Sequence, residues 1–235
     1  MNRRDFLLTV VVPCHNSQEF MQKTVGYLYS ALNNDEELIL VENGSTDNTL
    51  FALKSLFGTT IPENVVVTQS PKGLGLALKH GIEMASGKKI VFMEDDLPFG
   101  LQELNLARNV DVTGKYFILS KYHGSVRNLG LRKIQGLVFI FLRESILGLK
   151  VRDSQATFFG DAAVIKDIGR CSVQKGFLVT LEFIGLARKM GIEITEIPCE
   201  SLAKSIRPTT LKFRDVLQMF IGLFEVKRYM RTFKN

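Results

Sequence analysis

The sequence lacks any apolar run that approaches the ~20 residues needed to cross a lipid bilayer. Its N-terminal apolar stretch leads into Pro13, Cys14 and His15 without the small-residue cleavage site of a secretory signal peptide, which favours a strand there. We therefore expect a protein that is soluble or that lies on a membrane surface.

Cysteine is scarce, and linker-like composition is absent. Cys14, Cys171 and Cys199 lie far apart and show no metal-ligand spacing, so we expect free, buried thiols in a reducing compartment. No Pro- or Ser-rich linker, repeat or low-complexity tract divides the 235 residues. With 46% hydrophobic content, the chain is long enough for one sizeable core, and we expect one domain.

The charge balance is basic, with 30 Lys and Arg residues against 24 Asp and Glu residues. A net charge of +6 suits an anionic partner such as a nucleotide, a phosphate or an acidic lipid surface. The positive residues are scattered, and basic residues are seldom interleaved with aromatic ones, which argues against nucleic-acid binding.

Strand-like and helix-like segments alternate through the first 94 residues. We expect strands over 6–13, 37–43, 63–69 and 88–94, with helices over 17–33, 45–57 and 73–86 between them. Ser45 or Thr46 is the expected N-cap of the second helix, and Gly87 is expected to close the third. This alternation is typical of right-handed βαβ units, and it predicts an α/β fold with a mainly parallel sheet flanked by helices.

After residue 100 the rhythm changes, but we interpret the remainder as the second half of the same domain. The expected elements are a strand over 115–121, a basic and apolar segment over 125–149, an apolar stretch over 156–165, a helix over 177–191 and a strand over 192–199. Residues 211–235 have helical spacing of apolar residues, with Lys and Arg toward their end. This segment is either a helix packed on the domain or a basic amphipathic helix on anionic lipid.

Polar residues follow three of the expected strands. Ligands of parallel sheets bind beyond the carboxyl ends of the strands, which places Asn16, residues 42–45 and the acids 94–96 at one edge. In an extended segment Glu94 and Asp96 lie on the same side of the chain, where they can hold Mg²⁺ or Mn²⁺ together with diphosphate oxygens. The alternative is a solvated acidic loop.

Two further features of this edge have plain structural interpretations. Gly73 and Gly75 precede a helix but lack the phosphate-binding P-loop pattern, so we assign them to loop-to-helix geometry beside the nucleotide. His15 is expected to be a hydrogen-bonded turn residue, since no two histidines have metal-ligand spacing.

Four blocks of sequence in this order resemble the GT-A-fold family 2 glycosyltransferases, and within them the dolichyl- or polyprenyl-phosphate mannose and glucose synthases. The blocks are LTVVVPCHNSQEF (8–20), ELILVENGSTDNT (37–49), KGLGLALKHGIEMASGKKIVFMEDDLPF (72–99) and LGLKVRDSQATFFGDAAV (147–164). The resemblance extends to about residue 207. It implies a GT-A (Rossmann-like) domain over 1–207, followed by a basic amphipathic helical segment over 208–235.

The resemblance also implies a set of donor-binding residues. The loop from Pro13 to Asn16, with Glu42 and Asn43, would contact the base and ribose of a nucleotide sugar. The family usually has Asp-Asp where this chain has Glu42 and Asn43, and the amide of Asn43 both donates and accepts, so the nucleobase preference stays open. The other implied donor-binding residues are Lys72, Asp95, Lys121 and Arg207.

The family's Asp-x-Asp metal motif falls on residues 94–96, so Glu94 and Asp96 are the implied metal ligands. Glu94 replaces the first Asp, and its longer side chain can still reach a cation.

The implied catalytic residues are Asp96, Asp153 and Arg132. Asp153 belongs to a block with Ser154 and Gln155. Arg132 lies beside Lys133 in a basic segment that holds phosphates in family members or forms a solvated helix face. Lys204, Ser205 and Arg207 lie in a segment that carries a basic residue over the active site or is an ordinary loop.

The acceptor is argued from the need for a base. A hydroxyl acceptor needs a carboxylate to take its proton, whereas a lipid phosphate is already anionic. In hydroxyl-accepting relatives the base is an Asp at the position of Thr180, which cannot serve. This favours a phosphate acceptor. Glu182 is a rival base or a member of a structural ion pair.

These arguments predict an inverting hexosyltransferase that uses a nucleotide-diphosphate sugar, a Mg²⁺ or Mn²⁺ ion and a polyprenyl phosphate acceptor. We expect it in the cytoplasm or on the cytoplasmic face of the membrane, where a membrane-protein partner could supply the anchor. The alternatives are transfer to a saccharide hydroxyl, with Asp153 or Glu182 as base, and a non-catalytic nucleotide-sugar-binding homologue.

Overall fold

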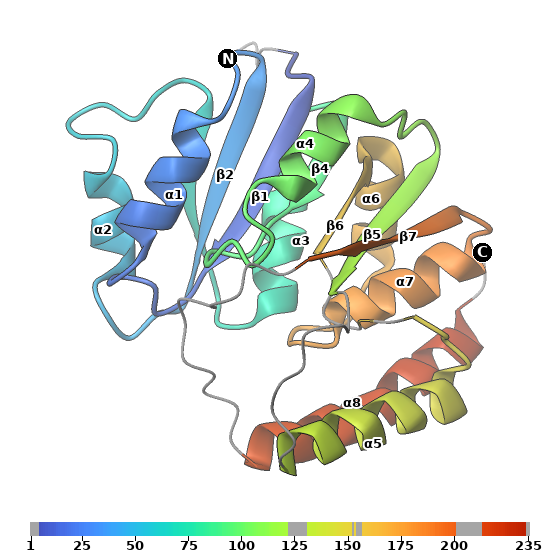
Figure 1. Ribbon diagram of the computed structural model, residues 1–235. Helices are drawn as coiled ribbons and strands as arrows, with labels where there is room; N and C mark the ends of the chain where they lie inside the picture. The colour runs from blue at the N-terminus through green and yellow to red at the C-terminus, as the bar shows by residue number, and fades with distance from the viewer. Residues whose placement is uncertain (1–4, 122–130, 152, 154–156, 201–212, 234–235) are drawn as a thin grey trace.

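The computed structural model describes residues 5–121, 131–151, 153, 157–200 and 213–233 (Figure 1). The predicted α/β architecture is confirmed within these residues by a seven-stranded sheet in the order β3-β2-β1-β4-β6-β5-β7. Its strands are β1 (Leu8–Cys14), β2 (Glu36–Asn43), β3 (Val65–Ser70), β4 (Lys89–Phe92), β5 (Lys115–Lys121), β6 (Thr157–Asp161) and β7 (Glu193–Cys199). Only β6 runs antiparallel to its neighbours, β4 and β5, so the sheet is mainly parallel.

Helices cover both faces of the sheet. The helices are α1 (Met21–Ser30), α2 (Thr49–Ser55), α3 (Leu74–Met84), α4 (Gln102–Asn109), α5 (Leu131–Leu147), α6 (Ala162–Cys171), α7 (Val179–Lys189) and α8 (Phe213–Thr232). One face packs against α1, α2 and α4, and the other against α3, α6 and α7 (Figure 1). The pair α5 and α8 lies outside this second helical layer.

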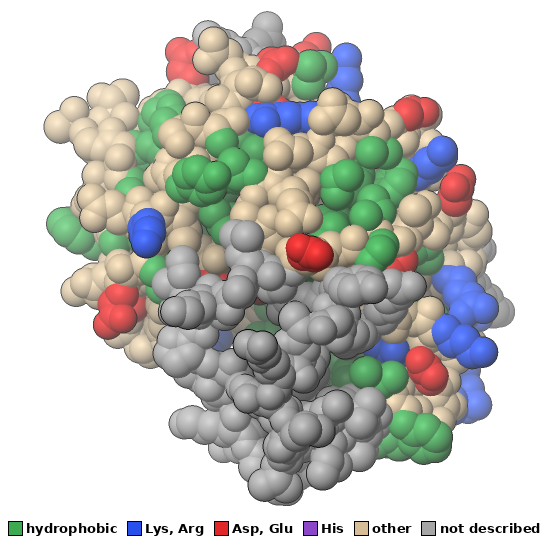
Figure 2. Space-filling view, viewed as in Figure 1, with side chains coloured by type: hydrophobic (Ala, Val, Ile, Leu, Met, Phe, Trp, Pro, Cys, Tyr) green, Lys and Arg blue, Asp and Glu red, His purple; other side chains and the backbone are tan. Residues whose placement is uncertain are grey.

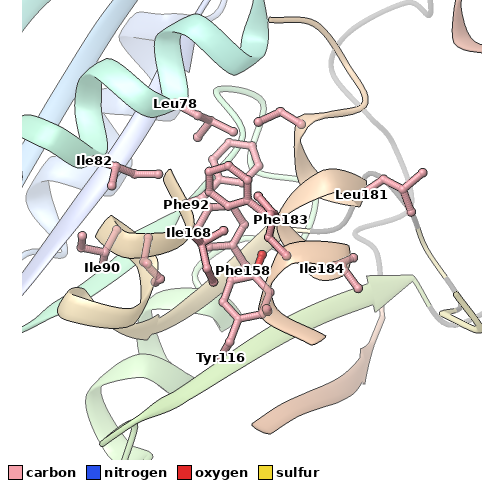
Figure 3. Close-up of a cluster of buried hydrophobic side chains, with 14 of the residues drawn as sticks. Leu78, Ile82, Ile90, Phe92, Tyr116, Phe158, Ile168, Leu181, Phe183 and Ile184 are labelled. Carbon is pink, nitrogen blue, oxygen red and sulfur yellow. The ribbon is translucent and has the colours of Figure 1, made fainter. Parts of the chain in front are cut away.

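Successive side chains of each strand point to opposite faces of the sheet, so the core consists of two clusters. Along β1, Val10 and Val12 join the cluster beneath α1 and α2, while Val11 joins the cluster beneath α3. Figure 3 shows part of the second cluster, where aromatic side chains meet at Phe158. The ring of Phe158 lies 5.3 Å from that of Phe92 and 5.6 Å from that of Phe183, measured between centroids. These contacts lock α7 onto the sheet.

Helix α8 contributes to this same cluster through Leu223, Val226 and Met230. The ring of its Phe220 lies 6.2 Å from that of Phe139 on α5. Of the two alternatives for the C-terminal segment, α8 therefore corresponds to a helix packed on the domain. None of the described helices is both long and apolar enough to cross a membrane.

Two predicted element ends are wrong. The second helix begins at Thr49 with Asn48 as its N-cap residue, because Ser45 and Thr46 instead hydrogen-bond the loop after β1. The third helix ends at Met84, so Gly87 does not close it. A Cβ on Gly87 would lie 2.6 Å from the Leu8 carbonyl carbon, so glycine permits close approach to β1.

Candidate functional site

The loops after β1 and β2 are held together at the carboxyl edge of the sheet. The Asn16 amide N–H donates to Ser45 Oγ over 3.1 Å, and the Thr46 N–H donates to Asn16 Oδ1 over 2.8 Å. Asn16 has a φ of 51°, a left-handed conformation that asparagine tolerates better than most residues. The loop that begins at Pro13 is therefore fixed against residues 45 and 46.

Glu42, at the end of β2, is buried but ionised. Its carboxylate accepts hydrogen bonds from the Ser45 N–H over 2.5 Å and from Gln69 Nε2 over 3.1 Å. Burial raises the pKa of Glu42, but these hydrogen bonds outweigh it, and the pKa lies below its usual value. Glu42 thus supplies a fixed negative charge beneath the loop.

Asn43 connects the same loop to α3. Its Oδ1 accepts a hydrogen bond from the Gly73 N–H over 2.6 Å, and its backbone carbonyl lies 2.8 Å from Nδ1 of His15. A carbonyl only accepts, so Nδ1 of His15 carries the proton, which agrees with the turn role expected for this histidine. A Cβ on Gly44 would lie 2.9 Å from Cβ of Lys72, so exposed Lys72 borders this loop directly.

The acidic segment lies beyond the end of β4, as predicted, but it is a turn rather than an extended segment. The Leu97 N–H donates to the Glu94 carbonyl over 3.1 Å, and Leu97 has a φ of 47°. The alternation argument that placed Glu94 and Asp96 on one side therefore fails. A leucine in this conformation is rare and costs energy, which indicates that the turn is held by its surroundings.

The middle acid joins this turn to the first loop. Asp95 is buried and accepts a hydrogen bond from Ser17 Oγ, whereas Glu94 and Asp96 are half-buried. All three loops at the carboxyl edge thereby form one connected network. Two half-buried carboxylates suit Mg²⁺ or Mn²⁺, which take one or two protein carboxylates and complete their coordination with substrate phosphates. No cluster of three or more His, Cys, Asp or Glu side chains suited to a metal occurs in the described parts of the chain.

The predicted residues of the second half are only partly visible. Lys121 ends β5, whose carboxyl end lies at the same edge as that of β4, and Arg132 lies in the first turn of α5. The side chains of both fall outside the described residues, as do Ser154, Gln155, Lys204, Ser205 and Arg207.

Asp153 is half-buried just before β6 and lies near Arg143. Burial lowers the pKa of the Arg143 guanidinium, and the charges of Glu144 and Asp153 oppose that shift. Asp153 therefore stabilises a buried cation.

Glu182 does not have the surroundings of a base. It is fully buried, and its carboxylate accepts hydrogen bonds from Ser172 Oγ, the Val173 N–H (3.1 Å) and the Gln174 N–H (3.0 Å). Its structural role is thus to bind backbone amides rather than to form the expected ion pair. Thr180, two residues earlier on α7, is buried as well.

The turn that Glu182 holds reaches the candidate site through α3, a connection that sequence reasoning missed. The Gly75 N–H donates to the Lys175 carbonyl over 2.9 Å. A Cβ on Gly73 or Gly75 would come within 2.3 Å of a backbone carbonyl oxygen of residue 175 or 174. The glycines before α3 were the available signal, because close backbone approach is one reason for glycine in a loop.

A sheet of this order, with polar loops at the carboxyl ends of β1, β2 and β4, defines the GT-A class of fold. Residues 9–104 match the family model described as Glycosyl transferase family 2. The chain superposes on crystal structures of glucosyl-3-phosphoglycerate synthase from Mycobacterium tuberculosis. The complex with Mn²⁺ and UDP-glucose gives a TM-score of 0.66 at 17% identity, covering 98% of this chain and 80% of that one. The complex with Mn²⁺, UDP and glucosyl-3-phosphoglycerate gives 0.64 at 15% identity, covering 98% and 81%.

Curated relatives match the N-terminal part at low identity. An uncharacterized glycosyltransferase from Nostoc sp. is 23% identical over 133 residues, which are 55% of this chain and 41% of that protein. The uncharacterized glycosyltransferase YibD from Escherichia coli is 28% identical over 89 residues, 38% of this chain and 26% of that protein. The chain thus spans less than half the length of these relatives. Together, the comparisons support glycosyltransferase family 2 and the GT-A fold, but not the narrower branch of polyprenyl-phosphate sugar synthases.

Proposed function

We propose that this protein is an inverting glycosyltransferase that takes a hexose from a nucleotide-diphosphate sugar. The observation that supports this most is the network at the carboxyl edge, where Ser17 and Asp95 join the loop after β1 to the acidic turn after β4. Two residues with left-handed backbone, Asn16 and Leu97, lie in this network, and strained backbone is common where a ligand must be gripped.

The donor would lie across these loops. Glu42 and Asn43, with the loop from Pro13 to Asn16, would contact the base and ribose, and Lys72 would contact the diphosphate. Lys121 and Arg207 would add positive charge from the second half. UDP-glucose is the donor bound in one of the structural neighbours, and it is the first donor to test here.

Glu94 and Asp96 would hold Mg²⁺ or Mn²⁺, the ions bound by the structural neighbours. Such an ion, when bound, stabilises the negative charge that develops on the departing diphosphate. The contribution of the chain is to fix the acidic turn through Asp95 and Leu97, so that two carboxylates stay close to the diphosphate position. Arg132 would act on the phosphates from the start of α5.

The acceptor we propose is a phosphate, in the first place a polyprenyl phosphate at the cytoplasmic membrane face. Buried Thr180 matches the position at which the resemblance implies an Asp base in hydroxyl-accepting relatives, and the carboxylate of Glu182 already accepts hydrogen bonds from three donors. An acceptor that is already anionic needs no base at this position. A membrane surface or a membrane-protein partner would then bring the lipid to the enzyme.

A saccharide hydroxyl is the second candidate acceptor, because half-buried Asp153 lies just before β6, whose start pairs with the end of β4, and could take a proton. The neighbours named glucosyl-3-phosphoglycerate synthase include a complex with phosphoglyceric acid, which makes a small phosphorylated acceptor a third arm of the same test.

The test is a panel of nucleotide-diphosphate sugars incubated with Mn²⁺ or Mg²⁺ and with each acceptor class, against an EDTA control. We expect metal-dependent sugar transfer from one donor to a short polyprenyl phosphate. Asp96→Ala should abolish it, while Asp111→Asn, at an exposed acid away from the site, should leave it intact. Equal turnover by Asp96→Ala would exclude the metal role, and donor binding without turnover would favour the non-catalytic alternative.

A further inference from the structure

A groove of about 510 Å³ lies where the C-terminal ends of α5, α7 and α8 meet. This place is remote from the carboxyl ends of β1 and β2 (Figure 1). The size falls in the range of roughly 300–1,000 Å³ that is typical of small-molecule sites. No step of the proposed sugar transfer uses it.

The rim of the groove is positive. It carries Arg188 and Lys189 from α7, with Lys227 and Arg231 from α8, and none of the ten lining residues is an acid. No salt bridge within the described residues involves any of these four cations. In Figure 2, Lys and Arg side chains gather over the ends of α7 and α8 at the right of the view. Four like charges around one hollow repel each other, and a bound anion would remove that repulsion.

The floor of the groove is apolar. Half-buried Ile146 and Leu147 line it, together with buried Leu149 and Met230. A Cβ on Gly185 would lie 3.1 Å from Sδ and Cε of Met230, so glycine lets Met230 pack closely against α7 beneath the groove. The groove therefore presents hydrocarbon below and cations above.

We propose that this groove is a second binding site, for an anionic amphiphile with one hydrocarbon chain and a phosphate headgroup. The chain would lie on Ile146 and Leu147, and the phosphate would be held by the Lys and Arg rim. A free phosphate would not match the whole groove, because it would leave the apolar floor uncovered. A neutral hydrocarbon would not match it either, because it would leave the positive charges of the rim uncompensated. The proposal stands whether or not the protein transfers sugar.

The test is isothermal titration of the full chain with decyl phosphate below its micelle concentration, with inorganic phosphate and decanol as separate arms. We expect one decyl phosphate per chain, and both other arms to bind at least roughly tenfold more weakly, since each meets only half of the site. The double variant Lys189→Glu with Arg231→Glu should weaken binding by about tenfold or more.

The matched control is Lys23→Glu with Lys54→Glu, which makes the same charge change at exposed residues of α1 and α2. Equal weakening by this control would mean that net charge alone attracts the ligand, and the site would be rejected. Inorganic phosphate binding as tightly as decyl phosphate would also overturn the proposal. If the first variant does not fold, Lys227→Gln serves in its place. Donor binding measured on each variant separates this site from the carboxyl edge, because it should not change.

Discussion

The side chain of Glu103 is fully buried on α4, against Thr157 at the start of β6. Burial raises the pKa of Glu103 to about 7, and the hydrogen bond from Thr157 Oγ1, at 3.2 Å, offsets only part of that shift. Nothing in the sequence around residue 103 signals this, since the burial arises from β6, which is distant in the chain. Its charge also contributes to the raised pKa of Cys199 on β7, after the larger effect of burial.

Glu103 should make the protein less stable as the pH rises. Between pH 4.5 and about pH 7 the folded protein keeps this proton, whereas the unfolded chain has released it. The contribution of Glu103 to stability is therefore greatest below pH 4.5 and is lost as the pH rises to about 7. This pKa difference corresponds to about 3 kcal/mol in full. We expect Glu103→Gln, which cannot ionise, to gain about 2–3 kcal/mol relative to wild type between about pH 5 and pH 8.

Urea unfolding of both proteins at the two pH values measures this difference. Glu193→Gln, at an exposed residue of β7, is the matched control and should follow wild type throughout. A pH-independent difference between Glu103→Gln and wild type would show that Glu103 is ionised in the folded protein.

At the scale of elements, α3 is held on two sides. Asn43 accepts from the N–H of Gly73 on one side, and the turn fixed by Glu182 packs against Gly73 and Gly75 on the other. Lys79 Nζ also donates to the Ser172 carbonyl over 3.2 Å. The N-terminus of α3 therefore joins the candidate donor site to α7.

Gly75→Ala should disrupt this docking. The new Cβ would meet the Gln174 carbonyl oxygen at 2.3 Å, so backbone must move, and we expect a loss of about 2 kcal/mol in the free energy of unfolding. Gly26→Ala in α1 is the matched control, because its Cβ would meet nothing within 4 Å. This control should gain up to about 1 kcal/mol from helix propensity. Urea unfolding that gives both variants the same change would show that the contact is dispensable.

Alternation in the first half predicted β1 to β4 and their carboxyl edge, because parallel strands separated by helices leave little choice of arrangement. The second half was less predictable. The apolar stretch over 156–165 contains both β6 and the start of α6 without an intervening loop, and Asp161 both ends the strand and caps the helix by accepting from the Ala163 N–H. Asp161 is the one charged residue in this stretch, and a single charged residue does not show by itself that a strand ends and a helix begins there.

The candidate site was also only partly predictable from the sequence. Its residues could be placed at one edge from sequence, because strand ends define that edge. The contacts between them could not: Ser17 and Asp95 are 78 positions apart, and the turn at 94–97 broke the alternation on which the metal argument depended. Side-chain partners of this kind are set by packing, which pattern alone does not specify.

At the scale of the whole molecule, the proposed division at residue 207 crosses a continuous core. Leu223 of α8 is fully buried in the cluster that contains Phe158 of the sheet and Phe183 of α7. Tyr229 of α8 donates from its hydroxyl to the Cys171 carbonyl at the end of α6. Since these contacts bind α8 to the sheet, α6 and α7, we expect it to unfold together with the sheet rather than before it.

Leu223→Ala tests this coupling. Removing a buried leucine side chain should lower the free energy of unfolding by about 2–5 kcal/mol, whereas Phe224→Ala, on the exposed face of the same helix, should change it by no more than about 0.5 kcal/mol. Urea unfolding followed by far-ultraviolet and near-ultraviolet circular dichroism should give coincident single transitions for wild type and both variants. An early far-ultraviolet transition in Leu223→Ala would mean that α8 detaches alone, and the core would then be complete without it.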